Sequence, residues 1–230
     1  MTDNPIQNVS FPSNGHTAHG YLALPESGSG PGLVVIQEWW GLTSHIADIA
    51  NRLAAAGFVA LAPDLYGGPT THDAAEAKEL LVALPQDRAA RDLAGAVDYL
   101  LGRDEVTSST VGVIGFCMGG GFVLRLAALK PDQVSAAVPL YGLPGAEVPE
   151  GITAAVQGHF GEQDQSIPVP AVQRFFDALK STTPGPVELH LYDAGHAFLN
   201  DENLIGTYDP ENAKLAWDRA VTFLEGHIRA

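Results

Sequence analysis

Apolar and polar residues alternate with a period of two near the start of this chain. The alternation is clear over residues 17–24, and a shorter stretch of the same kind lies at residues 9–11. A period of two is typical of strands with one buried face. Ser13, Asn14 and Gly15 lie between the two stretches and have the chemistry of a hairpin turn. We therefore expect two antiparallel strands at the start of a sheet.

Farther along the chain, short continuous apolar runs replace this alternation, as is typical of strands buried on both faces. They predict strands at residues 33–36, 58–62, 110–114, 136–140, 153–160 and 187–192. Helical patterns separate them, at residues 44–56, 72–84, 86–102, 122–128, 169–179 and 210–228. Ser44 is the expected N-cap of the first helix, and Pro210 lies in the first turn of the last. This order predicts an α/β fold, a mostly parallel sheet with helices on both faces.

Length, composition and charge narrow the class of protein. The 230 residues are 46% apolar, which is enough for one sizeable core, so we expect a single domain over residues 1–230. Lys and Arg number 12 against 27 Asp and Glu, and no basic stripe is present, which argues against nucleic acid as a partner. Residues 1–20 are polar and no run of about 18 apolar residues occurs, so we expect no membrane association and a cytoplasmic location.

The chain has a single cysteine, Cys117, which excludes an internal disulfide and any C-x-x-C motif. It has no H-E-x-x-H pattern and no P-loop lysine, and its eight histidines are scattered. We therefore expect neither a metal ion nor a cofactor.

Cys117 lies in the glycine-rich stretch GFCMGG, residues 115–120, between an expected strand and an expected helix. The G-x-S-x-G nucleophile elbow has the same layout, because its sharp turn leaves no room for side chains beside the nucleophile. Here a cysteine stands in the nucleophile's place, at a helix N-terminus that favours a thiolate over a thiol. The alternative is a small buried cysteine in an ordinary tight turn.

Two later strand ends carry an acid and a histidine. The segment GEQD, residues 161–164, offers Asp164, and DAGH, residues 193–196, offers His196. The chain order of nucleophile, acid and histidine is that of α/β-hydrolases, and loops at the carboxyl edge of a parallel sheet let the three converge. Asp164 could instead be only a turn former, and His196 only a surface histidine. Glu162 is the rival acid, less favourable because it lies nearer the strand.

Five segments together resemble the dienelactone hydrolase (carboxymethylenebutenolidase) family and cover nearly the whole chain: QEWWG (37–41), APDLYG (62–67), GFCMGG (115–120), GEQD (161–164) and GHAF (195–198). The resemblance implies an α/β-hydrolase fold, in keeping with a mostly parallel sheet, helices on both faces and an antiparallel N-terminal strand pair. It implies Cys117 as the nucleophile, His196 as base and general acid, and Asp164 as its orienter. The backbone N–H groups of Trp39 and Met118 would form the oxyanion hole.

The resemblance also implies a role for Glu38, which would interact with the resting Cys117 thiol and release it as a thiolate when substrate arrives. A neighbouring carboxylate disfavours a second negative charge and so would keep the thiol protonated. Glu38→Gln is then expected to make Cys117 react faster with an alkylating agent. The alternative is a glutamate that binds backbone N–H groups and holds its loop.

The chain departs from the family where an anionic substrate would bind. The best-known members use two arginines, and the second of these positions is Asn200 here. Near the first, Lys78 is the only basic residue, while Arg88 and Arg91 are expected to be solvated helix residues. Lys78 and Asn200 are therefore the candidate substrate-binding residues. Because a lysine lacks the bidentate fork that matches a carboxylate, neutral lactones or short esters are expected to rival an anionic dienelactone.

These residues predict a cysteine hydrolase that opens a small-molecule lactone or ester through a thioester acyl-enzyme. The chain is expected to be a monomer or a weak homodimer. The alternatives are an acyltransferase, a general carboxylesterase or thioesterase of the same fold, and a non-catalytic binding relative.

Overall fold

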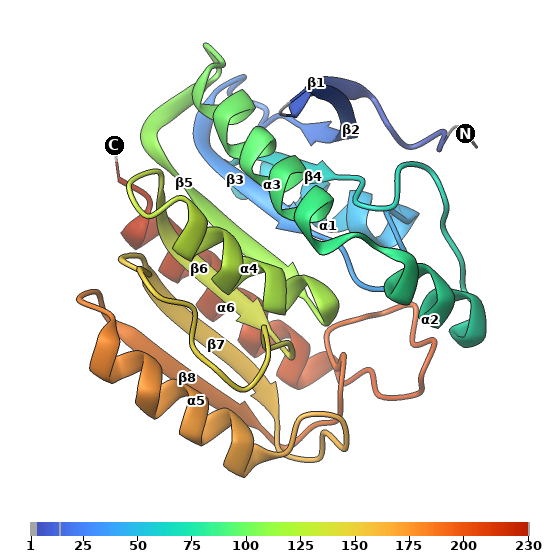
Figure 1. Ribbon diagram of the computed structural model, residues 1–230, viewed down its shortest axis with the longest axis vertical. Helices are drawn as coiled ribbons and strands as arrows, with labels where there is room; N and C mark the ends of the chain where they lie inside the picture. Colours follow the sequence, from blue (N-terminus) through green and yellow to red (C-terminus); the bar gives the residue numbers. More distant parts are fainter. Residues whose placement is uncertain (1–3, 14, 230) are drawn as a thin grey trace.

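One sheet of eight strands runs through the computed structural model of the protein, which describes residues 4–13 and 15–229 (Figure 1). The strands are β1 (Val9–Ser13), β2 (His16–Ala23), β3 (Gly30–Ile36), β4 (Val59–Pro63), β5 (Val106–Phe116), β6 (Val134–Leu140), β7 (Ala155–Gly161) and β8 (Val187–Tyr192). Their order across the sheet is β1-β2-β4-β3-β5-β6-β7-β8. Sequence order and sheet order therefore differ at β3 and β4, as expected when helices cross between parallel strands.

The pairing of the strands confirms the expected sheet. β1 pairs with β2 and β2 with β4 in antiparallel fashion, and every other neighbouring pair is parallel. In the opening pair, Val9 lies opposite Gly20 and Ser13 lies opposite His16. The predicted hairpin turn includes Asn14, which lies outside the described residues.

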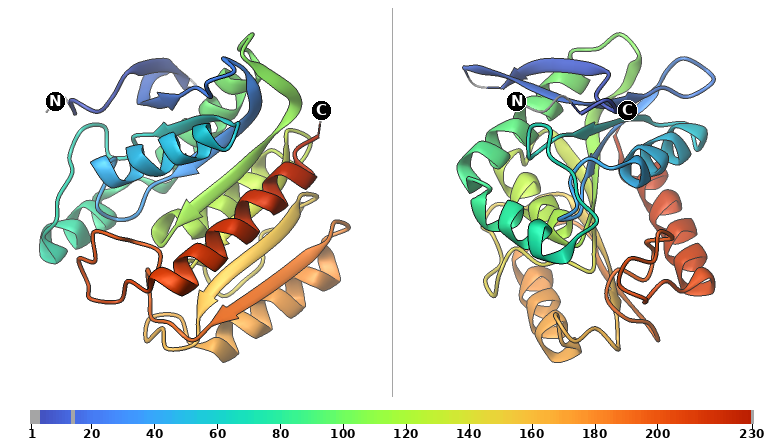
Figure 2. Two further views of the ribbon diagram at one scale, coloured as in Figure 1. Left: turned by 180° about the vertical axis from the view of Figure 1, so that it is seen from behind. Right: turned by 90° about the vertical axis from the view of Figure 1, so that its right-hand side faces the viewer.

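Helices cover both faces of the sheet. They are α1 (Ser44–Ala55), α2 (Ala74–Ala83), α3 (Gln86–Leu101), α4 (Met118–Leu129), α5 (Val169–Thr182) and α6 (Pro210–His227). α3, α4 and α5 lie on one face, and α1 and α6 lie on the other (Figures 1 and 2). Each face buries its own apolar layer, with Val123 and Phe176 in one and Ile49 and Leu224 in the other. Within the described residues, no helix combines the length and the apolar character that crossing a bilayer requires.

Several predicted boundaries are wrong, among them the start of β3, which is Gly30 and not residue 33, and the end of α5, which is Thr182 and not residue 179. Ser44 is the first helical residue of α1 and not its N-cap; Thr43 holds that position, and its side chain makes no capping hydrogen bond. β5 begins at Val106, well before the predicted residue 110, because Val106 already pairs with Gly30 of β3. The start of β5 is polar and half exposed, so a search for apolar runs does not detect it.

The carboxyl ends of the parallel strands carry the candidate residues. Glu38 follows β3, Cys117 follows β5, Asp164 follows β7 and His196 follows β8. The segment between β8 and α6, residues 193–209, passes along the same edge of the sheet (Figure 1). Parallel strands thus bring together side chains that lie far apart in the sequence.

Candidate active site

Cys117 occupies the turn between β5 and α4, where its backbone has φ 52° and ψ −116°. A positive φ strains a non-glycine residue by about 1–3 kcal/mol, and such strain clusters at functional sites. The turn is so tight that a Cβ on Gly115 would lie 2.5 Å from the Gly119 carbonyl oxygen. Glycine at this position therefore permits the turn, and the turn presents Cys117 to a cavity at the sheet edge.

A relay of hydrogen bonds joins Cys117 to two other strand ends. His196 Nε2 lies 3.2 Å from Cys117 Sγ, and His196 Nδ1 lies 2.7 Å from Asp164 Oδ2. The second carboxylate oxygen of Asp164 accepts from the backbone N–H groups of Ser166 and Ile167, at 2.7 and 3.1 Å. Asp164 is thus held at both oxygens, and it orients the imidazole with Nε2 toward the sulfur.

The electrostatics of the relay favour a protonated imidazole. Burial raises the pKa of Asp164, but the hydrogen bond and charge of His196 and two backbone N–H groups outweigh it and hold that pKa below its ordinary value. Burial lowers the pKa of His196. The hydrogen bonds that His196 makes with Asp164 and Cys117, together with the charges of these two groups, outweigh burial and raise this pKa to about 10. A proton shared between Cys117 and His196 is therefore favoured on the imidazole, where it is available to a leaving group.

Glu162, the rival acid, is exposed, and Asp164 occupies the place beside His196. The sequence alone separated these two carboxylates only by their distance from the strand. In the structure, Asp164 makes the hydrogen bond with His196, and the exposed Glu162 does not.

Glu38 is buried and lines the same cavity as Cys117 and His196. Asn200 Nδ2 donates to Glu38 Oε2 at 2.6 Å, while in the described chain Cys117 Sγ has its hydrogen bond with His196 and none with Glu38. Burial raises the pKa of Glu38, an effect that the charge on His45 and the Asn200 hydrogen bond oppose. The Asn200 amide thus holds one oxygen of the carboxylate, and a role of Glu38 toward the resting thiol stays a prediction. The carboxylate therefore joins two loops through a side chain, whereas the alternative interpretation expected backbone N–H groups as its partners.

Neither candidate substrate-binding residue offers a free polar group to the cavity. Asn200 is already hydrogen-bonded, and Lys78 lies away from the cavity. Asn200 lines the cavity, but its Nδ2 donates to Glu38 and its Oδ1 accepts from the Glu202 backbone N–H at 2.9 Å. Lys78 is exposed on α2 and is not among the residues that line the cavity in the described chain. The structure thus brings neither side chain to the cavity as a free polar group.

The cavity above Cys117 has a volume of about 480 Å³ and mostly apolar walls. Trp39 and Trp40 form one wall, with ring centroids 4.9 Å apart in an edge-on arrangement. Leu204 and Ile205, from the segment between β8 and α6, line it and remain partly exposed. No lysine or arginine lines it within the described residues. In that same part of the chain, no group of three or more His, Cys, Asp or Glu side chains is placed to hold a metal ion.

The backbone N–H groups of Trp39 and Met118 both belong to residues that line the cavity. Neither N–H donates a hydrogen bond to any acceptor in the described chain. Met118 is the first residue of α4, where the N–H groups have no partner within the helix and the helix dipole favours negative charge. Two such free donors beside a nucleophile can stabilise an oxyanion.

Tyr141 is a cavity residue that sequence reasoning missed. It has a positive φ of 37°, and its ring lies edge-on to that of His196, with centroids 5.5 Å apart. Its buried hydroxyl makes no hydrogen bond of standard geometry among the described residues, but burial, the charges of Glu38 and Cys117 and an interaction with the Glu38 carboxylate raise its pKa. Glu38 Oε1 is buried without a partner as well. The one available signal was that Tyr141 directly follows β6, at the sheet edge where sites are expected.

Comparison with known proteins places these features in a family. The sequence model of the dienelactone hydrolase family matches residues 18–228. Protein usf of Aquifex pyrophilus is 35% identical over 238 residues, covering 96% of this chain and 99% of the relative. A protein of Aquifex aeolicus (strain VF5) assigned as a carboxymethylenebutenolidase is 32% identical and covers 97% of this chain and 99% of the relative. The crystal structure of a protein from Klebsiella pneumoniae subsp. pneumoniae MGH 78578, assigned as a dienelactone hydrolase, is 33% identical with a TM-score of 0.83, covering 94% of this chain and 96% of that one. The chain therefore belongs to the dienelactone hydrolase family and is a hydrolase with the α/β-hydrolase fold.

Proposed function

We propose that this protein hydrolyses a lactone or small carboxylic ester through a thioester on Cys117. The observation that carries the proposal is the relay from Cys117 through His196 to Asp164, with distances of 3.2 and 2.7 Å, at the base of an apolar cavity. A nucleophile, a base and an orienting acid in hydrogen-bond reach of one another are the requirements of covalent acyl transfer.

In the first half of the reaction, His196 Nε2 takes the thiol proton and Cys117 Sγ attacks the carbonyl carbon of the substrate. The carbonyl oxygen becomes an oxyanion, to which the N–H groups of Trp39 and Met118 donate. The carbon–oxygen single bond of the ester then breaks, and the alkoxide leaves with the proton from His196. A thioester remains on the enzyme, and in a lactone the released hydroxyl stays attached to the acyl group.

In the second half, water takes the place of the thiol. His196 removes a proton from the water as the oxygen attacks the thioester carbon, and the Sγ–carbon bond breaks. The carboxylic acid product is released, and Cys117 regains its proton from His196. Donors already fixed where charge develops are worth about 10²- to 10³-fold in rate for each hydrogen bond.

The cavity favours a neutral substrate with an apolar part. Its walls include Trp39, Trp40, Leu204 and Ile205, and no lysine or arginine lines it in the described chain. Asn200 stands where the family's best-known members have an arginine, and its amide is bonded to Glu38. An anionic group in this cavity would lose its water of hydration without gaining a lysine or arginine partner from the described residues.

The test compares wild type with Cys117→Ser on an activated ester such as p-nitrophenyl acetate and on an unsaturated lactone. Loss of the activated thiol is expected to lower kcat/KM by about 10³-fold or more, and mass spectrometry of wild type mixed rapidly with the ester is expected to find one acyl group on Cys117. Near wild-type hydrolysis by folded Cys117→Ser would overturn the proposal. Ester in place of acid as the product in the presence of an added alcohol would identify an acyltransferase.

A further inference from the structure

Tyr66 contacts both residues proposed to form the oxyanion hole. Its hydroxyl donates to the Trp39 carbonyl oxygen at 3.0 Å and lies 3.7 Å from Met118 Sδ. The side chain is buried, and it is not among the residues that line the cavity in the described chain. The hydrogen bonds of its hydroxyl reach the site through Trp39 and Met118, and the charge of Cys117 also raises the pKa of that hydroxyl.

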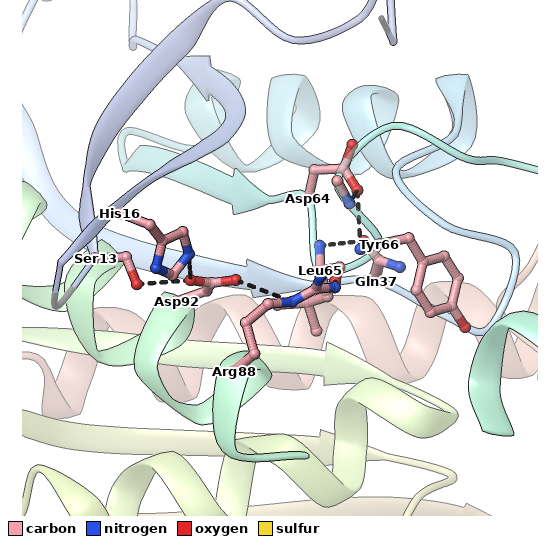
Figure 3. A network of polar contacts seen from close by, with 9 residues as sticks. Ser13, His16, Gln37, Asp64, Leu65, Tyr66, Arg88 and Asp92 are labelled. Carbon is pink, nitrogen blue, oxygen red and sulfur yellow. Dashed lines mark hydrogen bonds and ion pairs between the residues drawn. The ribbon is translucent and has the colours of Figure 1, made fainter. Parts of the chain in front are cut away.

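The loop that carries Tyr66 is fixed by its own hydrogen bonds. Asp64 Oδ1 accepts from the backbone N–H groups of Tyr66 and Gly67, at 3.1 and 2.9 Å. The Leu65 N–H donates to Gln37 Oε1 at 3.1 Å, which ties the loop to the residue next to Glu38 (Figure 3). The loop is thus bonded on one side to the strand end that leads into the oxyanion segment.

A second set of contacts supports the loop from α3. Arg88 was expected to be a solvated residue, but its Nη2 donates to the Leu65 carbonyl oxygen at 2.7 Å. Asp92 lies 3.9 Å from Arg88, accepts from Ser13 Oγ at 2.6 Å and pairs with His16 at 2.8 Å (Figure 3). The support for Tyr66 therefore extends across α3 to the opening strand pair.

The position of the oxyanion donors decides how much they contribute. A donor must lie about 2.7–3.1 Å from the oxyanion, and a displacement of about 1 Å can lower a rate about 10²-fold. The Tyr66 hydroxyl holds the carbonyl oxygen of Trp39, on the peptide that follows the Trp39 N–H, and it also contacts the Met118 side chain, so one hydroxyl links the two residues that supply the donors. Burial raises the pKa of Tyr66, which keeps the hydroxyl protonated and able to donate.

We propose that Tyr66 is a positioning residue that sets the distance between the two oxyanion donors. The inference rests on the proposed function, because it assigns Trp39 and Met118 to stabilise an oxyanion. It also gives the APDLYG segment a role in the reaction, although no residue of the segment lines the cavity in the described chain.

Tyr66→Phe tests the inference, because it removes the hydroxyl and keeps the ring. We expect kcat for an activated ester to fall about 10- to 100-fold with KM nearly unchanged. The second-order rate of alkylation of Cys117 by iodoacetamide is expected to stay within about twofold of wild type, since alkylation forms no oxyanion. Tyr21→Phe is the matched control, because the Tyr21 hydroxyl bonds Asn51 at 2.9 Å, on the outside of the protein.

If Tyr66→Phe lowered kcat for hydrolysis and the alkylation rate of Cys117 equally, Tyr66 would have a general structural role and the inference would be overturned. An unchanged kcat for hydrolysis would overturn it as well. If Tyr66→Phe does not fold, Met118→Leu removes the sulfur contact at nearly constant volume and is expected to give the same split between the two rates. Hydrolysis that survives in Cys117→Ser would instead refute the proposed function, independently of the result for Tyr66.

Discussion

Asp164 fixes His196 through one carboxylate oxygen and is itself fixed through the other. Asp164→Asn would present an N–H to His196 Nδ1 and place the imidazole proton on Nε2, where it cannot accept the thiol proton. We expect kcat to fall about 10²- to 10⁴-fold, measured with an activated ester. The far-UV circular dichroism spectrum should match that of wild type.

Glu162→Gln is the control for Asp164→Asn, because Glu162 is exposed near the same turn. Its kcat is expected to stay within about threefold of wild type, as for most exposed side chains away from a site. If Asp164→Asn kept the wild-type rate and Glu162→Gln lost it, the orienting role would move to Glu162.

Glu38→Gln distinguishes the two interpretations of the buried glutamate. The thiol pairs with His196 and Glu38 pairs with Asn200, and glutamine can still accept from Asn200. We therefore expect the alkylation rate of Cys117 at neutral pH to stay within about threefold of wild type. Much faster alkylation would restore the role that the family resemblance implies, in which Glu38 keeps the resting thiol protonated.

At the level of single residues, the sequence predicts site residues where a reactive side chain lies in a turn at the end of a strand. Cys117, Asp164 and His196 each follow a strand end within three residues of a glycine, and the structure joins them by hydrogen bonds. The contact between Asn200 and Glu38 spans 162 positions of sequence, so no local pattern could indicate it. For Tyr141 the only signal was its place directly after β6, because its ring contact with His196 exists only in the folded chain.

At the level of elements, buried strands and amphipathic helices were predictable because burial imposes a period on the sequence. The strand at residues 187–192 has the predicted bounds, whereas β5 extends beyond its apolar run as a half-exposed strand. α3, α5 and α6 begin at the predicted residues, whereas α1 is displaced by one residue, since Thr43 caps it through its backbone alone. Local propensity cannot decide between neighbouring serine and threonine residues when neither side chain caps the helix.

A polar network between β7, β8 and α6 predicts how stability depends on pH. His159 Nδ1 lies 2.8 Å from the Tyr192 hydroxyl, and its Nε2 lies 2.9 Å from Gln157 Oε1. Burial and the charges of His190 and Arg219 lower the pKa of His159 to about 3. The unfolded chain, with a histidine pKa of about 6.5, binds this proton first, so stability falls as the pH drops from about 6.5 to about 3.

His159→Asn should remove this contribution, which is at most about 1.4 kcal/mol per pH unit. We expect the free energy of unfolding in urea to fall less steeply with decreasing pH for the variant than for wild type, although the variant is less stable at neutral pH. His72→Asn is the control, because His72 is exposed. Equal slopes for wild type and His159→Asn would contradict the prediction.

At the level of the whole molecule, charge is expected to set substrate preference. The net charge is −15, and no lysine or arginine lines the cavity in the described chain. Each missing charge-assisted hydrogen bond is worth about 1.5–3 kcal/mol. We expect kcat/KM for a neutral lactone, the methyl ester of dienelactone, to equal or exceed that for the anionic acid, and the value for the acid to rise with salt as repulsion is screened.

Lys78→Met is the control for charge preference, because Lys78 is exposed and does not line the cavity. It should leave the ratio of the two kcat/KM values unchanged. Asn200→Arg alone would place its cation beside the Glu38 carboxylate, so a shift toward the acid is expected mainly when Asn200→Arg is combined with Glu38→Gln. A wild-type preference for the acid that Lys78→Met abolishes would contradict the prediction.

Three properties of the whole molecule stay predictions: the single domain over residues 1–230, the monomer or weak homodimer, and the cytoplasmic location. The first is supported by one continuous sheet whose two faces carry separate apolar layers. No pattern within one chain reports the other two directly, because they depend on surfaces and partners outside it.

The pair of rings formed by Trp39 and Trp40 has an optical consequence. These are two of the three tryptophans of the chain, and both line the cavity above Cys117. The third, Trp217, lies on α6 with the guanidinium of Arg52 4.0 Å from its ring centroid. Intrinsic fluorescence from the first two should change when an acyl group displaces water from their faces, while emission from Trp217 stays constant. Formation and decay of an acyl-enzyme can therefore be followed in the unlabelled protein with substrates that have no chromophore.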